Sequence, residues 1–163
     1  MPKWSAVRAW LKEHRTLLWV AAVLLLIDRA TKVWALQDLA QHGPVVWGKY
    51  LWLNYVENTG MAFGLFQNGN AVLIVVMLAV IGYMIYSWKD IVRYGAWARW
   101  GAVFIITGAL GNLYDRFVLG FVVDFIDLRV WPVFNAADSF ITVGAVLLGV
   151  SLLQPQPAAQ EEK

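Results

Sequence analysis

Residues 134–153 read FNAADSFITVGAVLLGVSLL, an apolar run that opens with an asparagine and an aspartate. A helix needs about 20 mostly apolar residues to cross the hydrocarbon core of a bilayer, so this stretch predicts a membrane-spanning helix over 136–153. Pro155 and Pro157 end it, because proline cannot continue a helix. A carboxylate beside such a segment is costly and is rarely retained without a function. Asp138 is therefore the first candidate for a functional residue.

The composition of the whole chain is that of an integral membrane protein. Its 163 residues are 60% hydrophobic and only 15% charged, and the mean hydropathy is +0.58. The apolar runs predict an all-α fold with four transmembrane helices, over about 16–36, 71–88, 97–119 and 136–153. We expect a single membrane domain over 1–163, which ends in a disordered Pro/Gln/Ala tail over 154–163.

The distribution of positive charge predicts how these four helices are oriented. Eight lysines and arginines fall on the side that holds both termini: Lys3, Arg8, Lys12, Arg15, Lys89, Arg93, Arg99 and Lys163. The opposite side holds three, which are Lys49, Arg116 and Arg129. Because cytoplasmic loops are enriched in lysine and arginine, we expect both termini in the cytoplasm and the loops 37–70 and 120–135 outside.

The first outer loop contains a segment with strand character. Val45–Val56 alternates, with Leu51, Leu53 and Tyr55 on one side and Tyr50, Trp52 and Asn54 on the other. We expect a small β-rich element on the extracytoplasmic surface of the membrane. Its Trp and Tyr content suits the membrane interface, so the element either anchors the protein there or shapes a substrate site. The sequence leaves both alternatives open.

Composition also limits the chemistry. The chain has no cysteine, which excludes disulfides, thiolate catalysis and Cys-ligated metals. His14 and His42 stand far from any carboxylate cluster and are interpreted as solvated residues rather than as metal ligands. The net charge of +2 comes from scattered basic residues, without the clustered face that nucleic acid binding needs. We expect no metal, no cofactor and no nucleic acid partner.

Topology places two aspartates at one membrane depth. The third helix runs outward and the fourth returns, so Asp124, expected near the outer end of the third helix, and Asp138 can lie close together. Two neighbouring carboxylates in a low-dielectric setting share one proton, which supplies a base and an acid from identical side chains. The base activates a water and the acid polarises a scissile carbonyl. This pair predicts peptide hydrolysis.

Structural explanations compete with this interpretation. Asp138 also fits the N-terminal carboxylate of the fourth helix, with Asn135 as its N-cap. Asp28 and Lys32, at the outer end of the first helix, have the i,i+4 spacing and orientation of a stabilising ion pair. On the residues alone these alternatives stay open.

Further polar residues reach the same membrane depth. Asn58 lies in the first outer loop, and Asn112 and Arg116 share a face of the third helix at i,i+4. These two side chains can donate to a substrate carbonyl or to an aspartate. Asp115 and Arg116 are equally explained by pairing with other charges at the end of that helix.

Five motifs follow one another along the chain. They are Asp28-Arg29-Ala30-Thr31-Lys32, Asn58-Thr59-Gly60-Met61-Ala62-Phe63, Gly108-Ala109-Leu110-Gly111-Asn112-Leu113-Tyr114-Asp115-Arg116, Val123-Asp124-Phe125 and Phe134-Asn135-Ala136-Ala137-Asp138. In type and order they resemble those of the lipoprotein signal peptidases, the type II signal peptidases of bacterial membranes. The resemblance covers essentially the whole chain.

This resemblance implies a role for each candidate. Asp124 and Asp138 are expected to be a catalytic aspartate dyad. The residues expected to line the site or to support its wall are Asn58, Asn112, Arg116, Asn135, Asp28 and Lys32. The family fold has four helices and a β-rich cradle on the outer surface of the bacterial cytoplasmic membrane. The implied partners are membrane lipid and the substrate, a diacylglyceryl-modified prolipoprotein that is cut immediately before its lipidated cysteine.

The chain departs from the family pattern at three positions. Arg29 stands where glutamine is usual, Met61 where alanine is usual, and Thr107 where a second glycine commonly precedes Gly108. None removes a member of the dyad, so we expect altered substrate or inhibitor preferences and intact activity.

Two other classes of protein compete with a peptidase. A small transporter would need a coupling carboxylate near the membrane midplane, whereas the acids here gather at the outer ends of the helices. A non-catalytic scaffold would leave the convergence of these polar residues unexplained.

Overall fold

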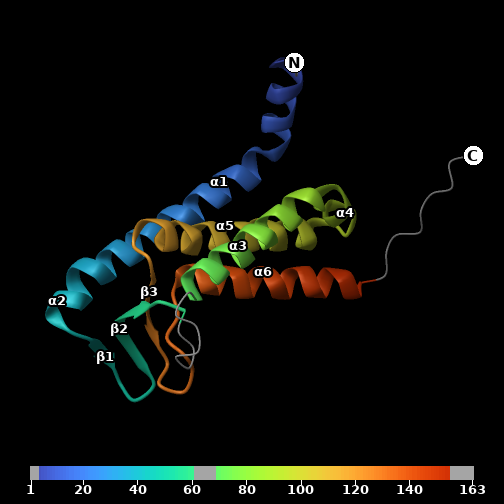
Figure 1. Ribbon diagram of the computed structural model, residues 1–163. Helices are drawn as coiled ribbons and strands as arrows, with labels where there is room; N and C mark the ends of the chain where they lie inside the picture. The colour runs from blue at the N-terminus through green and yellow to red at the C-terminus, as the bar shows by residue number, and fades with distance from the viewer. Residues whose placement is uncertain (1–3, 61–68, 155–163) are drawn as a thin grey trace, which may run out of the picture.

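The computed structural model describes residues 4–60 and 69–154. The first helix, α1 (Trp4–Trp34), continues through the π-helical turn η1 (Ala35–Leu39) into α2 (Ala40–His42). The remaining helices are α3 (Gly69–Tyr86), α4 (Trp88–Arg93), α5 (Ala96–Val118) and α6 (Ala136–Leu153). The strands lie at one end of these helices, and both ends of the described chain lie at the other (Figure 1).

The helix over 136–153 coincides with its predicted bounds, but the first helix does not match 16–36. It begins at Trp4 and runs on, with its continuations, to His42, well inside the expected loop 37–70. The thickness of the bilayer sets the length of the apolar segment, but the helix itself can extend beyond the bilayer. It does so here because the charged residues on either side of the apolar segment are good helix formers. The predicted disordered tail lies outside the described residues, apart from Gln154.

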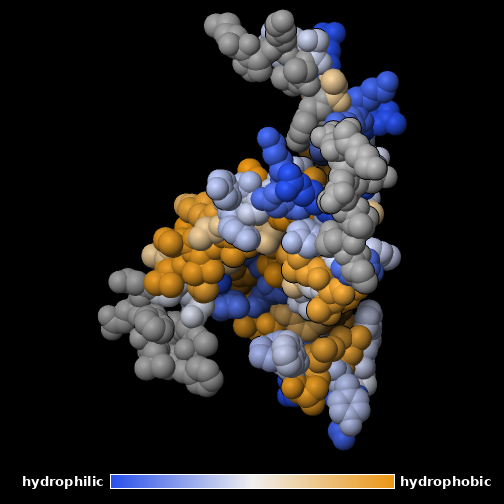
Figure 2. All heavy atoms as spheres, turned by 90° about the vertical axis from the view of Figure 1, so that its right-hand side faces the viewer, coloured by the Kyte–Doolittle hydropathy of each residue, from blue (hydrophilic) through white to orange (hydrophobic). Residues whose placement is uncertain are grey.

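Within the described ranges, two helices are long and apolar enough to cross a membrane. They are α3 and α6, with mean hydropathies of 2.1 and 1.9. The outward face of α3 exposes apolar residues such as Val72, Val75 and Ile85. Figure 2 shows apolar side chains over broad areas of the middle and lower surface of one face. α1 and α5 are less apolar because they carry the polar residues of the site.

The small sheet expected over 45–56 is confirmed. β1 (Val45–Trp47) pairs antiparallel with β2 (Leu51–Asn58), and Tyr50 lies in the turn between them. β2 then pairs antiparallel with a third strand, β3 (Val122–Asp127), in the register Val56↔Asp124 and Asn58↔Val122. This pairing brings β2 and β3, which are far apart in the sequence, into one sheet.

Asp124, expected near the outer end of the third helix, lies on a strand that follows this helix. α5 ends at Val118, and Gly120 follows with a φ of 85°, a backbone conformation that stops a helix and that glycine adopts without strain. Asp124 lies in the middle of β3. The segment 120–135 is therefore not simply a loop. Nearly every residue of β3 is buried, so the alternation that reveals a strand in a sequence is missing.

Two contacts position β3 and α6 for the site. Val123 and Phe125 pack with Ala35 and Leu39 of η1, which seats β3 against the end of the first helix. α6 packs closely against α5, where a Cβ added at Gly101 would lie 2.7 Å from the backbone oxygen of Gly144. Small residues permit such close helix packing.

Candidate active site

Asp124 and Asp138 come from different elements and are joined through Asn135. Asp124 lies on β3 and is buried, with 2% of its surface exposed. Its Oδ1 accepts a hydrogen bond of 2.7 Å from Asn135 Nδ2, and its Oδ2 accepts one of 2.8 Å from Asn58 Nδ2. Asp138, in the first turn of α6, accepts from the Asn135 backbone N–H at 3.1 Å. Asn135 therefore touches both carboxylates.

The capping alternative for Asp138 is confirmed and does not exclude a site role. Asn135 Oδ1 accepts from the Asp138 N–H at 3.0 Å, and with the reverse bond this forms a complete capping box. The cap uses Asp138 Oδ2, whereas Oδ1 faces α5 and accepts from Asn112 Nδ2 at 2.7 Å. One carboxylate thus starts the helix and belongs to the site.

Backbone pairing fixes where α6 begins. Phe134 N donates to Ile126 O at 3.1 Å, and Phe134 O accepts from the N–H groups of Phe125 and Ile126 at 3.0 and 2.8 Å. The next residue, Asn135, is the N-cap of α6. Asn135 is therefore held beside β3 at the level of Asp124.

Three asparagine amides face the aspartates, and each is oriented by a group that can only donate to its oxygen. Asn58 Oδ1 accepts from the Gly60 N–H at 2.9 Å, and Asn135 Oδ1 accepts from the Asp138 N–H. Asn112 Oδ1 accepts from Lys32 Nζ at 2.8 Å. A backbone N–H and an ammonium cannot accept hydrogen bonds, so each NH₂ group must point at a carboxylate.

Burial raises the pKa of Asp124 to about 6. The amide donors of Asn58 and Asn135 and the charge of Lys32 favour the ionised form, whereas the nearby Asp138 carboxylate opposes it. The net result places the ionisation of Asp124 close to neutral pH. A carboxyl group poised in this range exchanges its proton readily, as general acid–base chemistry requires.

A cluster of four charged residues, here called the charge cluster, lies next to Asn112. Lys32 Nζ contacts Asp28 Oδ1 at 3.1 Å and Asp115 Oδ2 at 2.8 Å. Arg29 Nη2 contacts Asp115 Oδ1 at 2.6 Å and Asp28 Oδ2 at 3.2 Å. The i,i+4 ion pair expected for Asp28 and Lys32 is therefore present, but as part of a larger network. Asp28 Oδ1 also accepts from the Ala137 N–H at 3.2 Å, at the start of α6.

Arg116 is buried but lies apart from the hydrogen bonds of the aspartates. Its Nη1 donates to Asn70 Oδ1 at 3.1 Å, and its Nε has no partner within residues 4–60 and 69–154. In the same ranges it forms no ion pair with Asp124 or Asp138. Arg116 therefore joins α5 to the start of α3 beside the site.

The sequence interpretation did not include Asn70, Asp115 or Arg29 among the site residues. Asp115 could have been recognised from the sequence, because it is a carboxylate three residues from Asn112 within an otherwise apolar helix. Asn70 directly precedes the second apolar run, and a single asparagine at such a place carries little information.

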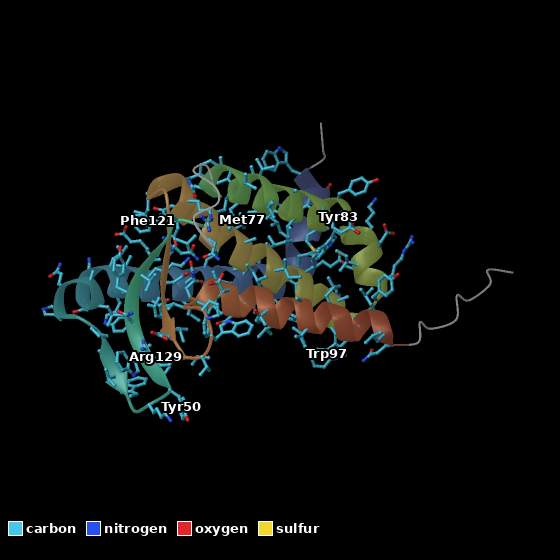
Figure 3. The ribbon with its side chains drawn as sticks, turned by 60° about the horizontal axis from the view of Figure 1, so that its bottom comes forward. Tyr50, Met77, Tyr83, Trp97, Phe121 and Arg129 are labelled. Atoms are coloured by element: carbon cyan, nitrogen blue, oxygen red, sulfur yellow. The ribbon has the colours of Figure 1, made fainter. Side chains whose placement is uncertain are left out.

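In Figure 3 polar side chains meet where the sheet approaches the helix ends, whereas Tyr50 and Arg129 lie at the far end of the sheet.

An apolar groove of ≈ 380 Å³ reaches Asp138 from outside α6. It is lined by Leu128, Trp131, Phe134, Asp138, Ser139, Thr142 and Val143. The hydroxyls of Ser139 and Thr142 donate to backbone oxygens of their own helix at 3.1 and 2.9 Å, so they offer little polarity to the groove. Asp138 is the partly accessible aspartate, and the groove gives a ligand a route to it. The described residues contain no cluster of three or more His, Asp or Glu suited to a metal ion.

The fold is similar to that of known membrane enzymes. Two solved structures, each described as a bacterial membrane enzyme, are similar to this chain with TM-scores of 0.75 and 0.79 and identities of 25% and 26%. They cover 91% and 86% of this chain and 93% and 94% of their own chains.

The sequence comparisons show the family. The model of the family described as Signal peptidase (SPase) II matches residues 20–154. The chain belongs to this family of peptidases, which confirms the resemblance found in its motifs.

Curated relatives named lipoprotein signal peptidase match most of the chain. The protein of Thermodesulfovibrio yellowstonii is 44% identical over 131 residues, which are 77% of this chain and 86% of the relative. Those of Clostridium novyi and Clostridioides difficile are 38% and 40% identical, over 80% and 84% of this chain and 92% and 95% of their own lengths.

Proposed function

We propose that this protein is an aspartyl endopeptidase that removes the signal peptide from diacylglyceryl-modified prolipoproteins, cutting immediately before the lipidated cysteine. The observation that carries this proposal is the pair Asp124 and Asp138, joined through Asn135 and held by oriented amides. Asn58, Asn112, Asn135 and Arg116 surround the pair, and Asp28 and Lys32 support its wall. The names of the relatives supply the substrate class.

The proposed mechanism uses one shared proton. The ionised aspartate takes a proton from a water, whose oxygen attacks the scissile carbonyl carbon, while the protonated aspartate donates a hydrogen bond to the carbonyl oxygen. When the C–N bond of the tetrahedral intermediate breaks, the aspartate that took the proton from the water passes it to the departing amine. In this proposal Asp124 and Asp138 carry all of these protons.

We further propose that α1, α3, α5 and α6 span the bacterial cytoplasmic membrane, with both termini in the cytoplasm and the dyad on the outer side. The eight-to-three distribution of positive residues supports this orientation, as does the position of both ends of the described chain far from the sheet (Figure 1). The native chain lacks cysteine, so Lys49→Cys and Arg93→Cys each provide a single label. Position 49 is expected to react from outside and position 93 only after permeabilisation. Labelling of position 93 from outside would reverse the topology.

The apolar groove at Asp138 supports a lipidated substrate. An acyl chain that stays in contact with apolar surface contributes about 0.8 kcal/mol per buried CH₂ group, which is binding energy that an unlipidated precursor lacks. The diacylglyceryl group can remain in the bilayer while the adjoining peptide reaches the dyad.

The deciding experiment is cleavage by the purified full-length protein of a diacylated prolipoprotein and of the same precursor without lipid. Wild type is expected to release the signal peptide from the lipidated form, and Asp124→Asn to leave it intact. Equal cleavage of both precursors would point to a general intramembrane aspartyl protease. Unimpaired cleavage by Asp124→Asn would reject the aspartyl mechanism.

A further inference from the structure

The charge cluster is buried beside the dyad and is electrically balanced. Asp28, Lys32 and Asp115 are 1%, 0% and 0% exposed. Arg29 closes the cluster toward the surface, with 29% of its side chain exposed and its guanidinium 4.7 Å from the centroid of the Tyr114 ring. Two carboxylates and two cations sum to zero charge. Buried charges are tolerated when they are paired in this way, and an unpaired one is costly.

Two short paths connect Asp115 to the dyad. One passes from Asp115 Oδ2 through Lys32 Nζ to Asn112 Oδ1, and then from Asn112 Nδ2 to Asp138. On the other, Asp115 Oδ2 accepts from the Val123 N–H at 3.4 Å, one residue before Asp124. Asp115 therefore contacts the supports of both aspartates. Arg29 holds Asp115 through the shortest ion pair of the cluster, at 2.6 Å.

We propose that Arg29 and Asp115 form a positioning ion pair that holds Lys32 and Asn112 in place and sets the electric field of Lys32 at the dyad. This inference rests on the proposed peptidase function and adds two residues to its machinery.

The charged groups that face Asp124 come from three helices. They are Asp138 on α6, Lys32 on α1 and Arg116 on α5, while β2 presents the neutral amide of Asn58. Of these, Lys32 is the one whose charge the cluster balances. Removing the charge of Arg29 leaves the cluster with a net negative charge, whereas removing that of Asp115 leaves it net positive. The two changes must act on the ionisation of Asp124 in opposite directions.

The test is the pH dependence of kcat and KM for a lipidated precursor, with Arg29→Gln and Asp115→Asn in the purified full-length enzyme. Arg29→Gln is expected to move the acid limb of the profile to higher pH and Asp115→Asn to lower pH, each by about half a pH unit. Loss of positioning is expected to lower kcat about tenfold in Asp115→Asn, and less in Arg29→Gln, with KM nearly unchanged. Arg29→Lys is expected to return the limb to its wild-type position but to restore kcat only in part, because an ammonium lacks the planar fork of a guanidinium.

A matched control is available on α4. Arg93 pairs with Asp90 at 3.3 Å, with side chains 78% and 72% exposed, and Arg93→Gln makes the same chemical change far from the site. It is expected to leave the profile unmoved. Limbs that shift in the same direction in Arg29→Gln and Asp115→Asn, or that do not move, would overturn the inference.

Two further measurements separate the possible failures. If Asp115→Asn does not fold, Arg29→Gln and Arg29→Lys still decide the question, because Arg29 is partly exposed. Infrared titration of isotope-labelled aspartate in an Asp138→Asn background, with the spectrum of the Asp124→Asn/Asp138→Asn double variant subtracted, reports the Asp124 ionisation without turnover. The same shifts there support the inference even if the peptidase activity is not found. If the wild-type enzyme cleaves the precursor but the acid limb does not move in Arg29→Gln, this inference is rejected and the proposed peptidase function stands.

Discussion

Two pairs of aspartates lie side by side in this molecule, and they differ in what holds them. Asp28 and Asp115 contact two cations, Lys32 and Arg29, at 2.6 to 3.2 Å. Asp124 and Asp138 are held, in the described ranges, by amide and backbone donors without an ion pair. A carboxylate with a counter-ion has its charge compensated, whereas one that is buried among amides can exchange a proton near neutral pH. Of the two buried pairs, the one without a paired cation is therefore the candidate for proton exchange.

The largest expected effect comes from replacing Asp124 or Asp138. Asp124→Asn and Asp138→Asn are each expected to lower kcat by roughly 10⁴-fold or more, because neither an acid nor a base is left to share the proton. The double variant is expected to be hardly worse than either single variant, since the two residues act as one unit. A turnover assay with the lipidated precursor measures this. Near wild-type turnover in either single variant would contradict the distinction between the two pairs.

Breaking the compensated pair is expected to affect stability first. Lys32→Met leaves Asp28 and Asp115 without their buried partner and is expected to destabilise the protein by about 3–5 kcal/mol. Asp124→Asn is expected to cost less, because it leaves no buried charge unpaired, although its NH₂ group would face the amide donor of Asn58 or Asn135. Thermal unfolding in detergent compares the two variants. A larger loss for Asp124→Asn than for Lys32→Met would show that the roles of the pairs are reversed.

Arg116 tests whether a cation beside the dyad acts on it from a distance. Arg116→Ala is expected to lower turnover about 100-fold and to alter the pH profile, because the guanidinium charge favours ionised carboxylates. Asn70→Ala is expected to cost about tenfold, since it frees the guanidinium but keeps its charge. Arg116→Lys is expected to rescue in part. Unchanged kinetics with only a lower melting temperature in Arg116→Ala would assign the residue to joining α3 and α5.

The smallest expected effect comes from the amide of Asn58, which contacts Asp124. Asn58 donates to Asp124 and favours its ionised form, so Asn58→Ala is expected to raise the pKa of Asp124 above about 6. Activity that needs an ionised carboxylate rises with pH through this pKa, and the acid limb is therefore expected to move upward, by about one pH unit. The pH profile of kcat/KM measures the shift. A limb that stays in place or moves to lower pH would show that the amide of Asn58 does not control this ionisation.

The site residues could be found in the sequence because polar groups beside apolar helices are conspicuous. Asp124 and Asp138 stand out for this reason, and the N-cap role of Asn135 follows from its spacing to Asp138. β3 was missed because its residues are buried on both faces, which removes the alternation of polar and apolar residues. Asn70 was missed because one asparagine at the start of a helix is a weak signal.

Sequence alone was sufficient for the helical class, the bounds of α6, the strand character of 45–56, the family and the candidates for the dyad. These follow from local properties: apolar length, alternation, capping spacing and motif order. Which carboxylates receive cations or amides from another element is visible in the folded structure and not in the sequence. The partners of Asp115 and Asp124 come from other elements of the fold. The pair of Asp28 with Lys32 lies within one helix and could be expected from its i,i+4 spacing. The pairing of charges depends on distances between side chains that folding brings together, and local sequence does not contain those distances.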